Sequence, residues 1–260
     1  MNLKLLFQMK LLVTAKIVAD PEAEPKVLFG KRSLKGTRRM VDVIDDTNVQ
    51  AIRESLPEAE VTVINIGCLS NREPLAKLIA LGSNEVIQMC GSEKLIASLD
   101  CLAKAKLLKD FVLSNSYNLV ILGCQSSDTT SAQVGPALAG LLNWPCITGV
   151  KLIKQLPNKN VIANCSFEDI NVDINVPSKC ILTCDLSVKT PKLVTVVDLI
   201  KAKRKPINVN QISEVNFELR QQLTVVEEII SNTPRLSRVF THFANAWSTV
   251  TSWLKKNKWL

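Results

Sequence analysis

Residues 118–145 read NLVILGCQSSDTTSAQVGPALAGLLNWP, and this stretch decides the fold class of the chain. It opens with the apolar run 118–123, which is typical of a strand buried on both faces of a parallel sheet. A polar loop follows at 124–133, and the apolar segment 134–142 then carries Pro136 in its first turn, where helices favour proline. A buried strand that leads through a loop into a helix is half of a βαβ unit.

The same alternation of strand and helix continues from this stretch toward the N-terminus. The pattern predicts three more strands and three more helices, at 10–18, 60–67, 85–89 and at 45–54, 73–81, 92–114. We therefore predict an α/β fold with a mostly parallel, doubly wound, Rossmann-like sheet. In such sheets ligands bind outside the carboxyl ends of the strands.

The pattern changes after residue 145. Short β runs dominate 146–186, which predicts an antiparallel extension of the sheet, and a helix-like segment with a basic end follows at 193–205. With 260 residues, the chain fits one large domain or a domain plus an arm. We divide it into an N-terminal extension at 1–9, an α/β domain at 10–206 and a C-terminal arm at 207–260.

The C-terminal arm is expected to carry an amphipathic helix at 236–254. Apolar residues, among them Trp247 and Val250, recur there at helical spacing, and Lys255 and Lys256 follow. Three interpretations stay open. The helix packs against a partner subunit, it lies in a membrane interface, or it belongs to the core of this chain.

Composition excludes several classes of site. The chain has 32 basic and 24 acidic residues, but no aromatic platform or known module accompanies its net charge of +8, so we expect no nucleic-acid binding. A metal site or triad based on histidine would rest on His242 alone. The eight cysteines form no CxxC pair, which predicts buried thiols in a reducing compartment and no metal site. No apolar run reaches the ~18 residues of a membrane span.

The polar loop at 124–133 is the strongest candidate for a binding site. Five of the six residues 126–131 carry a hydroxyl group, and the loop ends at a helix N-terminus, where backbone N–H groups favour an anion such as phosphate. The alternative is a loop whose hydroxyl groups only cap the helix. The pattern of a Walker P-loop is absent, and no GxGxxG follows the first strand.

At this loop the chain resembles the beta subunit of electron transfer flavoprotein. Four segments match the family in order, and the third is the closest. They are LLVTAKIVADP (11–21), EPLAKLIALGSNEVIQM (73–89), the stretch 118–145, and LTCDLSVKTPKLVTVVDLIKAKRKPI (182–207).

The resemblance implies an electron carrier without catalytic residues of its own, whose residues 10–206 form the family's nucleotide-binding domain. Such a subunit forms a heterodimer with an alpha subunit that holds most of the FAD, and it holds a structural AMP itself. Electrons would pass from acyl-CoA and related dehydrogenases, as in fatty acid oxidation, through the FAD to a membrane quinone oxidoreductase. The implied compartment is the bacterial cytoplasm or the mitochondrial matrix.

Position by position, the resemblance implies eight AMP contacts and a separate dehydrogenase-docking segment. The AMP contacts would be Thr14, Asp42, Ile66, Asp128, Thr129, Ala132, Gln133 and Val134. The docking segment would be Thr195, Val196 and Val197.

The chain departs from the family at Asp42-Val43-Ile44, where the family has Asn-Pro-Phe. This departure keeps two alternatives open. One is a nucleotide-binding scaffold or regulatory protein of the same fold without the redox role. The other is a bifurcating variant that carries a second flavin in place of AMP.

Overall fold

The computed structural model describes most of the chain. The described residues are 9–20, 22, 26–28, 31–33, 38–157, 160–167, 170–188, 193–212 and 243–256. The chain divides into two compact units, Met1–Thr224 and Val225–Leu260, and each is considered by itself. The expected extension at 1–9 lies outside the described residues except for Met9.

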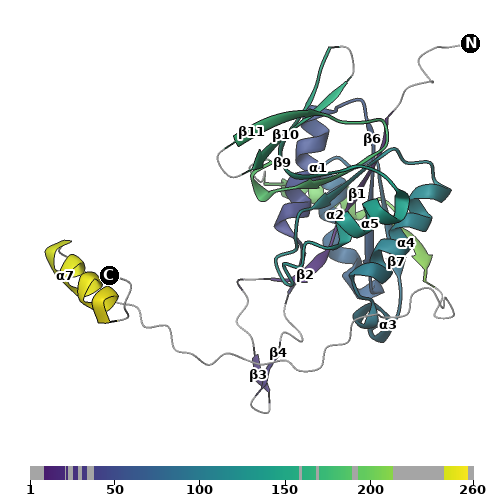
Figure 1. The fold of residues 1–260 in the computed structure, drawn as a ribbon. Helices are drawn as coiled ribbons and strands as arrows, with labels where there is room; N and C mark the ends of the chain where they lie inside the picture. The colour runs from purple at the N-terminus through teal and green to yellow at the C-terminus, as the bar shows by residue number, and fades with distance from the viewer. Residues whose placement is uncertain are drawn as a thin grey trace, which may run out of the picture. The chain divides into compact units, whose positions relative to one another are not determined.

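A nine-stranded sheet forms the centre of the first unit, with strands in the order β11-β10-β9-β12-β8-β1-β6-β7-β13 (Figure 1). The β9–β10 and β10–β11 pairs are antiparallel, and all other neighbouring pairs in this sheet are parallel. The predicted α/β class, with a mostly parallel sheet and an antiparallel extension, is confirmed. The strands are β1 Lys10–Thr14, β6 Glu60–Gly67, β7 Glu85–Cys90, β8 Leu119–Gly123, β9 Cys146–Gln155, β10 Val161–Phe167, β11 Ile170–Asn175, β12 Cys180–Cys184 and β13 Asn208–Gln211.

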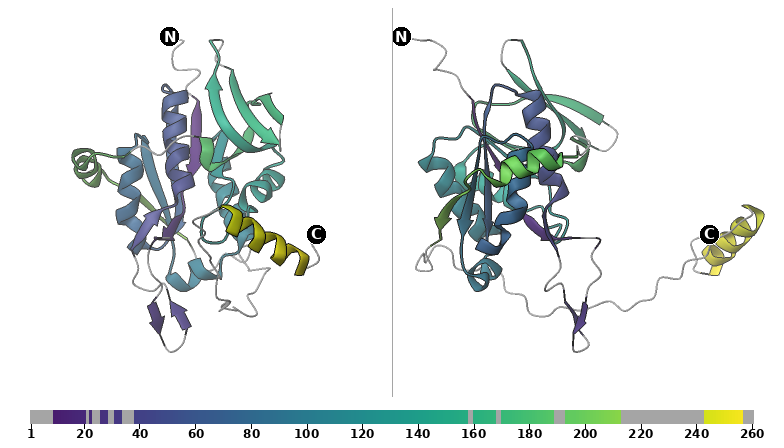
Figure 2. Two further views of the ribbon diagram at one scale, coloured as in Figure 1. Left: turned by 90° about the vertical axis from the view of Figure 1, so that its left-hand side faces the viewer. Right: turned by 180° about the vertical axis from the view of Figure 1, so that it is seen from behind.

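Helices cover both faces of the sheet, as Figure 2 shows. Side chains alternate along the central strand β1, so Leu11 and Val13 join one apolar cluster with α1 and α2, while Leu12 joins the other with α4 and α5. All three side chains are fully buried, as expected of a strand covered on both sides. The helices of this unit are α1 Val43–Ser55, α2 Arg72–Ala80, α3 Glu93–Ser98, α4 Cys101–Ser114, α5 Val134–Leu142 and α6 Val196–Lys203.

Two predicted elements are each divided in the structure. The expected strand 10–18 ends at Thr14, and β2 Ile17–Ala19 pairs instead with β5 Arg39–Val41 in a small antiparallel sheet. The expected helix 92–114 breaks at Leu99, because Asp100 caps a new helix by accepting the N–H of Ala103 at 2.8 Å.

Two smaller features lie on either side of this core. The segment 21–39, which we expected to be irregular or a hairpin, contains the antiparallel pair of β3 Lys26–Leu28 and β4 Lys31–Ser33. We predicted no strand after residue 206, but β13 pairs with β7 at the edge of the sheet. The sheet therefore extends into the segment that we assigned to the arm.

The second unit contains α7 Phe243–Lys256, within the span in which an amphipathic helix was expected. Residues 236–242 of the expected helix lie outside the described residues. Among the described residues, no helix has both the length and the apolar character that crossing a membrane requires.

The order of the strands locates the ligand edge of the sheet. From β1 the chain continues to β6 on one side, and it later returns to β8 on the other side. The segments that follow β1 and β8 therefore diverge at a topological switch point, where open α/β sheets bind their ligands. The loop 124–133 follows β8 at this point.

Candidate ligand-binding site

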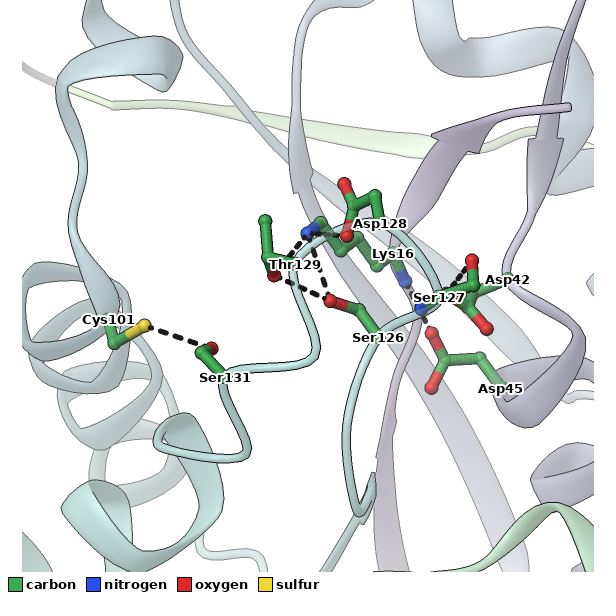
Figure 3. A network of polar contacts seen from close by, with 9 residues as sticks. All are labelled: Lys16, Asp42, Asp45, Cys101, Ser126, Ser127, Asp128, Thr129 and Ser131. Carbon is green, nitrogen blue, oxygen red and sulfur yellow. Dashed lines mark hydrogen bonds and ion pairs between the residues drawn. The ribbon is translucent and has the colours of Figure 1, made fainter. Parts of the chain in front are cut away.

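The side chain of Lys16, just after β1, lies on the loop that follows β8 (Figure 3). Its Nζ is 2.5 Å from Asp128 Oδ1, 3.2 Å from Ser126 Oγ and 3.5 Å from Thr129 Oγ1. The Ser126 and Thr129 hydroxyl groups are 2.8 Å apart. One ammonium group therefore gathers three oxygen-bearing side chains of the loop, which we call the ligand loop (residues 124–133).

Asp42 binds the ligand loop to the start of α1. Its Oδ2 accepts the backbone N–H of Ser127 at 2.7 Å and the Ser127 hydroxyl at 2.8 Å, while Oδ1 accepts the N–H of Ile44 at 3.2 Å. The residue is only 1% exposed, and both of its carboxylate oxygens are engaged within the chain. Asp42 thus caps a helix and anchors the ligand loop at once.

Asp45 lies one turn further along α1 and is buried. Its Oδ2 accepts the backbone N–H of Lys16 at 2.7 Å. Burial raises the pKa of Asp45 to about 8, and the neighbouring Asp42 and Asp46 also raise it, against hydrogen bonds from the Lys16 and Gly123 N–H groups. Asp46, the next residue, forms an ion pair with Lys77 of α2.

The N-terminus of α5 lacks a side-chain cap. Gln133 stands at the N-cap position without a capping hydrogen bond, and the first turn contains no acidic residue. The approach to α5 includes two non-glycine residues with left-handed backbone, Thr130 at φ 47° and Ala132 at φ 53°. Such a turn before an uncapped helix presents backbone N–H groups to an anion.

The N-terminus of α4 lies beside the same loop. Cys101, its first residue, places Sγ 3.5 Å from Ser131 Oγ (Figure 3). Burial lowers the pKa of Lys104, one turn later, and the Lys16 ammonium lowers it further. Two lysines and the uncapped N-terminus of α5 thus meet at the ligand loop, a combination that suits an anionic ligand, whereas Asp100 already caps α4.

Asp128 is the acidic residue within the ligand loop itself. Burial raises the pKa of its carboxyl group, but hydrogen bonds from Lys16 and Ser126 outweigh that effect and hold the pKa below its usual range. The carboxylate is therefore charged at neutral pH, and it takes up one of the hydrogen bonds that the Lys16 ammonium group can donate.

The structure brings most of the candidate contacts to one edge. Asp42, Asp128 and Thr129 belong to one network with Lys16 and Ser127. The remaining candidates lie at the ends of β1 and β6 and at the start of α5; they are Thr14, Ile66, Ala132, Gln133 and Val134.

The expected docking segment is separate from the ligand loop. Thr195 caps α6 by accepting the N–H of Asp198 at 3.1 Å. Val196 and Val197 follow in the first turn with exposed side chains. Helix α6 packs against α2.

Sequence reasoning missed Lys16, Asp45 and Lys104 as members of the site. Lys16 had a signal, since it is a lone cation directly after the first buried strand. The burial of Asp45 and Lys104 depends on packing between distant segments, and the sequence holds no local sign of it.

Comparison with known proteins identifies the family. The family model for the electron transfer flavoprotein domain matches residues 45–215. A probable electron transfer flavoprotein subunit beta from Saccharomyces cerevisiae is 31% identical over 242 residues, covering 87% of this chain and 90% of that protein. The mitochondrial electron transfer flavoprotein subunit beta of Oryza sativa subsp. japonica is 28% identical over 229 residues, covering 84% of this chain and 88% of that protein.

A third relative belongs to a larger assembly. It is the caffeyl-CoA reductase-Etf complex subunit CarD of Acetobacterium woodii, 29% identical over 208 residues, covering 77% of this chain and 78% of that protein. The chain belongs to the electron transfer flavoprotein family, in the class of its beta subunits. It is thus a component of flavin-dependent electron transfer, and a beta subunit implies an alpha-subunit partner.

Proposed function

We propose that this chain holds AMP as a structural element at the ligand loop and completes, with its alpha subunit, an electron carrier that binds FAD. The observation that carries the AMP proposal is the uncapped N-terminus of α5 at the switch point of the sheet, with Lys16 beside it. A nucleotide phosphate supplies the negative charge and the acceptor oxygens that this position lacks.

The residues present fit a mononucleotide. The Ser126 and Thr129 hydroxyl groups and the first N–H groups of α5 would hold the phosphate, with Lys16 as its counter-charge. Thr14 and Ile66, at the ends of β1 and β6, would line the nucleoside. Asp42 would contribute by holding Ser127 in place, because both of its oxygens are already engaged.

FAD, when bound, supplies the redox chemistry by accepting and releasing electrons. We assign most of its binding to the alpha subunit and give this chain no catalytic residue. Its part is to position the partner subunit and the donor proteins, which makes it an electron carrier subunit.

We further propose that the start of α6 docks acyl-CoA and related dehydrogenases, through Thr195, Val196 and Val197. Leu193 is 94% exposed and Val196 73% exposed, so two apolar side chains at the start of α6 are open to a partner. The accepting protein would be a membrane quinone oxidoreductase, and the compartment a bacterial cytoplasm or a mitochondrial matrix.

Co-expression with the alpha subunit, followed by extraction of nucleotide and flavin, tests this function. We expect a yellow 1:1 complex with one FAD and one AMP. Two flavins and no AMP would instead support a bifurcating carrier, an alternative that the similarity to a reductase-complex subunit keeps in view. AMP without flavin would support a scaffold or regulatory protein, and a complex with neither would reject the proposal.

Two matched variants locate the AMP. Ser126→Ala and Thr129→Ala remove hydroxyl groups that face Lys16, and each should lower the AMP content of the complex while FAD stays at one per heterodimer. Ser114→Ala is the control, because Ser114 is exposed at the last residue of α4, at the opposite end of that helix from Cys101 and the ligand loop. Unchanged AMP in both loop variants would place the nucleotide elsewhere.

A further inference from the structure

Asp45 stands behind the ligand loop at the junction of three elements. It belongs to α1, it accepts the N–H of Lys16 after β1, and it receives a hydrogen bond from the N–H of Gly123 at the end of β8. The residue is 6% exposed, so these contacts lie out of water. A single carboxyl group therefore joins the ends of the two strands at the switch point.

The packing at Gly123 shows how closely α1 approaches β8. A Cβ atom on Gly123 would lie 2.9 Å from Ile44 Cγ2 and 3.2 Å from Asp45 Oδ1. Only glycine leaves room for the first turn of α1 at this strand end. The position of Asp45 relative to β8 is consequently tightly constrained.

Lys16 links the position of Asp45 to the ligand loop. Its backbone N–H is held by Asp45, while its Nζ reaches Asp128, Ser126 and Thr129. Movement of the Lys16 backbone would move the ammonium group away from the hydroxyl groups. Asp45 therefore acts on these three side chains through Lys16 and the end of β8.

The contacts of Asp45 need an acceptor but no negative charge. The groups that bind it are two backbone N–H groups, and its charged neighbours Asp42 and Asp46 disfavour a further charge. An asparagine side chain keeps one acceptor oxygen, which can serve the Lys16 N–H group, in a neutral group of the same size. A leucine fills a similar volume and offers no acceptor.

We propose that Asp45 is a positioning residue of the nucleotide site, which fixes the ends of β1 and β8 relative to each other and thereby holds Lys16 over the ligand loop. This proposal depends on the proposed function only for the identity of the ligand, AMP. The statement that Asp45 fixes the two strand ends and Lys16 concerns the chain itself and can be tested separately.

Amide hydrogen exchange of the full-length chain in complex with its alpha subunit tests the geometric part. In the wild-type complex the Lys16 amide should be protected, because it has a buried acceptor. Asp45→Leu should speed exchange at Lys16 and across the ligand loop about tenfold, whereas Asp45→Asn should restore wild-type rates. Asp46→Leu is the control. It also replaces a carboxylate in the same turn of α1 with leucine, but this carboxylate is paired with Lys77.

The affinity for added AMP, after removal of bound nucleotide, tests the consequence for the site. Asp45→Leu should weaken AMP binding about tenfold or more, with Asp45→Asn and Asp46→Leu close to wild type. Rescue by asparagine is the result that a role in bulk stability alone would not give.

Three results would overturn the assignment. The first is an unprotected Lys16 amide in the wild type, and the second is exchange in Asp45→Asn as fast as in Asp45→Leu. The third is a loss of AMP affinity in Asp46→Leu equal to that in Asp45→Leu. If Asp45→Leu does not fold, the exchange rates of the wild type and of Asp45→Asn still test whether Asp45 holds the Lys16 amide. If the wild type binds no AMP, the proposed function fails, while the exchange rates still test the role of Asp45.

Discussion

Lys16 Nζ and Asp128 Oδ1 lie 2.5 Å apart and join the end of β1 to the ligand loop after β8. The two side chains are 36% and 39% exposed, so water screens the pair and its contribution to stability is small. The contact places a cation among hydroxyl groups at a helix N-terminus, which is where a phosphate would bind. The pair thus matters for the ligand more than for the fold.

Replacing Lys16 with methionine should separate these two effects. We expect AMP affinity to fall about tenfold or more, because a charge-assisted contact is lost. The free energy of unfolding should change by less than about 1 kcal/mol. Calorimetric titration with AMP and denaturant unfolding measure the two quantities.

Lys203→Met is the matched control, since it breaks the exposed ion pair with Glu73, where the two atoms are 2.7 Å apart, away from the ligand loop. Equal loss of AMP affinity in both variants would show that Lys16 acts only through net charge.

The pKa of Asp45 predicts a pH dependence of stability. Its ordinary pKa is 3.8 and burial raises it to about 8, so between these values the folded chain holds a proton that the unfolded chain has released. Stability should therefore fall as pH rises from about 4 to about 8, by up to about 1 kcal/mol per pH unit, and then level off.

Asp45→Asn removes this ionisation. Its stability relative to wild type should increase steadily with pH up to about 8, which denaturant unfolding at pH 5, 7 and 9 would reveal. Asp46 contributes a dependence of the same sign, because burial raises its pKa as well, and the comparison with Asp45→Asn cancels that part. A difference between the two proteins that does not vary with pH would contradict the prediction.

Gly135 marks a close approach of α5 to β12. A Cβ atom there would lie 2.5 Å from Thr183 Cγ2, and Thr183 is buried and stiff about χ1. Gly135→Ala should therefore shift the start of α5, cost about 1–3 kcal/mol of stability and weaken AMP binding.

Gly140→Ala is the natural control in the same helix, because an added Cβ there would meet no atom within 4 Å beyond its chain neighbours and the backbone of its own helix. That substitution should stabilise the chain by up to about 1 kcal/mol, since alanine favours helix over glycine. Thermal unfolding with and without AMP distinguishes the two variants. Similar melting temperatures would refute the steric argument.

The start of α6 gives a prediction about electron transfer. Val196→Glu places a charge on an exposed apolar side chain, so it should slow reduction by an acyl-CoA dehydrogenase severalfold or more while leaving FAD content unchanged. Leu113→Glu is the control, on exposed Leu113 of α4. Stopped-flow reduction of the complex measures both rates, and equal rates would exclude α6 from the docking surface.

Periodicity alone predicted much of the sheet and its helices. The apolar run at 60–67 and the helix at 134–142 match β6 and α5 residue for residue, because their ends carry glycine, proline or an abrupt change to polar residues. The predicted strand 10–18 was too long, because its apolar residues fit one strand and the sequence does not show the hydrogen bonds of Lys16 to Asp45 and Asp42 that accompany the turn of the chain at that point.

Other features depend on contacts that no local pattern contains. The sequence of β13, NVNQ, has little apolar character, and it becomes a strand through pairing with β7. The sequence predicted a candidate site in the loop after β8 because this loop is rich in hydroxyl groups, and the structure places the loop at the switch point of the sheet. The anchoring roles of Asp42 and Asp45 required the structure, since each joins segments far apart in the chain.

The uncapped first turn of α5 has a consequence for the life of the protein in the cell. If AMP takes the place of the missing cap, the nucleotide becomes a folding partner, and a hundredfold excess over its dissociation constant adds about 3 kcal/mol to stability. The half-life of the subunit would then follow the supply of AMP, so that the amount of electron carrier rises and falls with the adenylate pool.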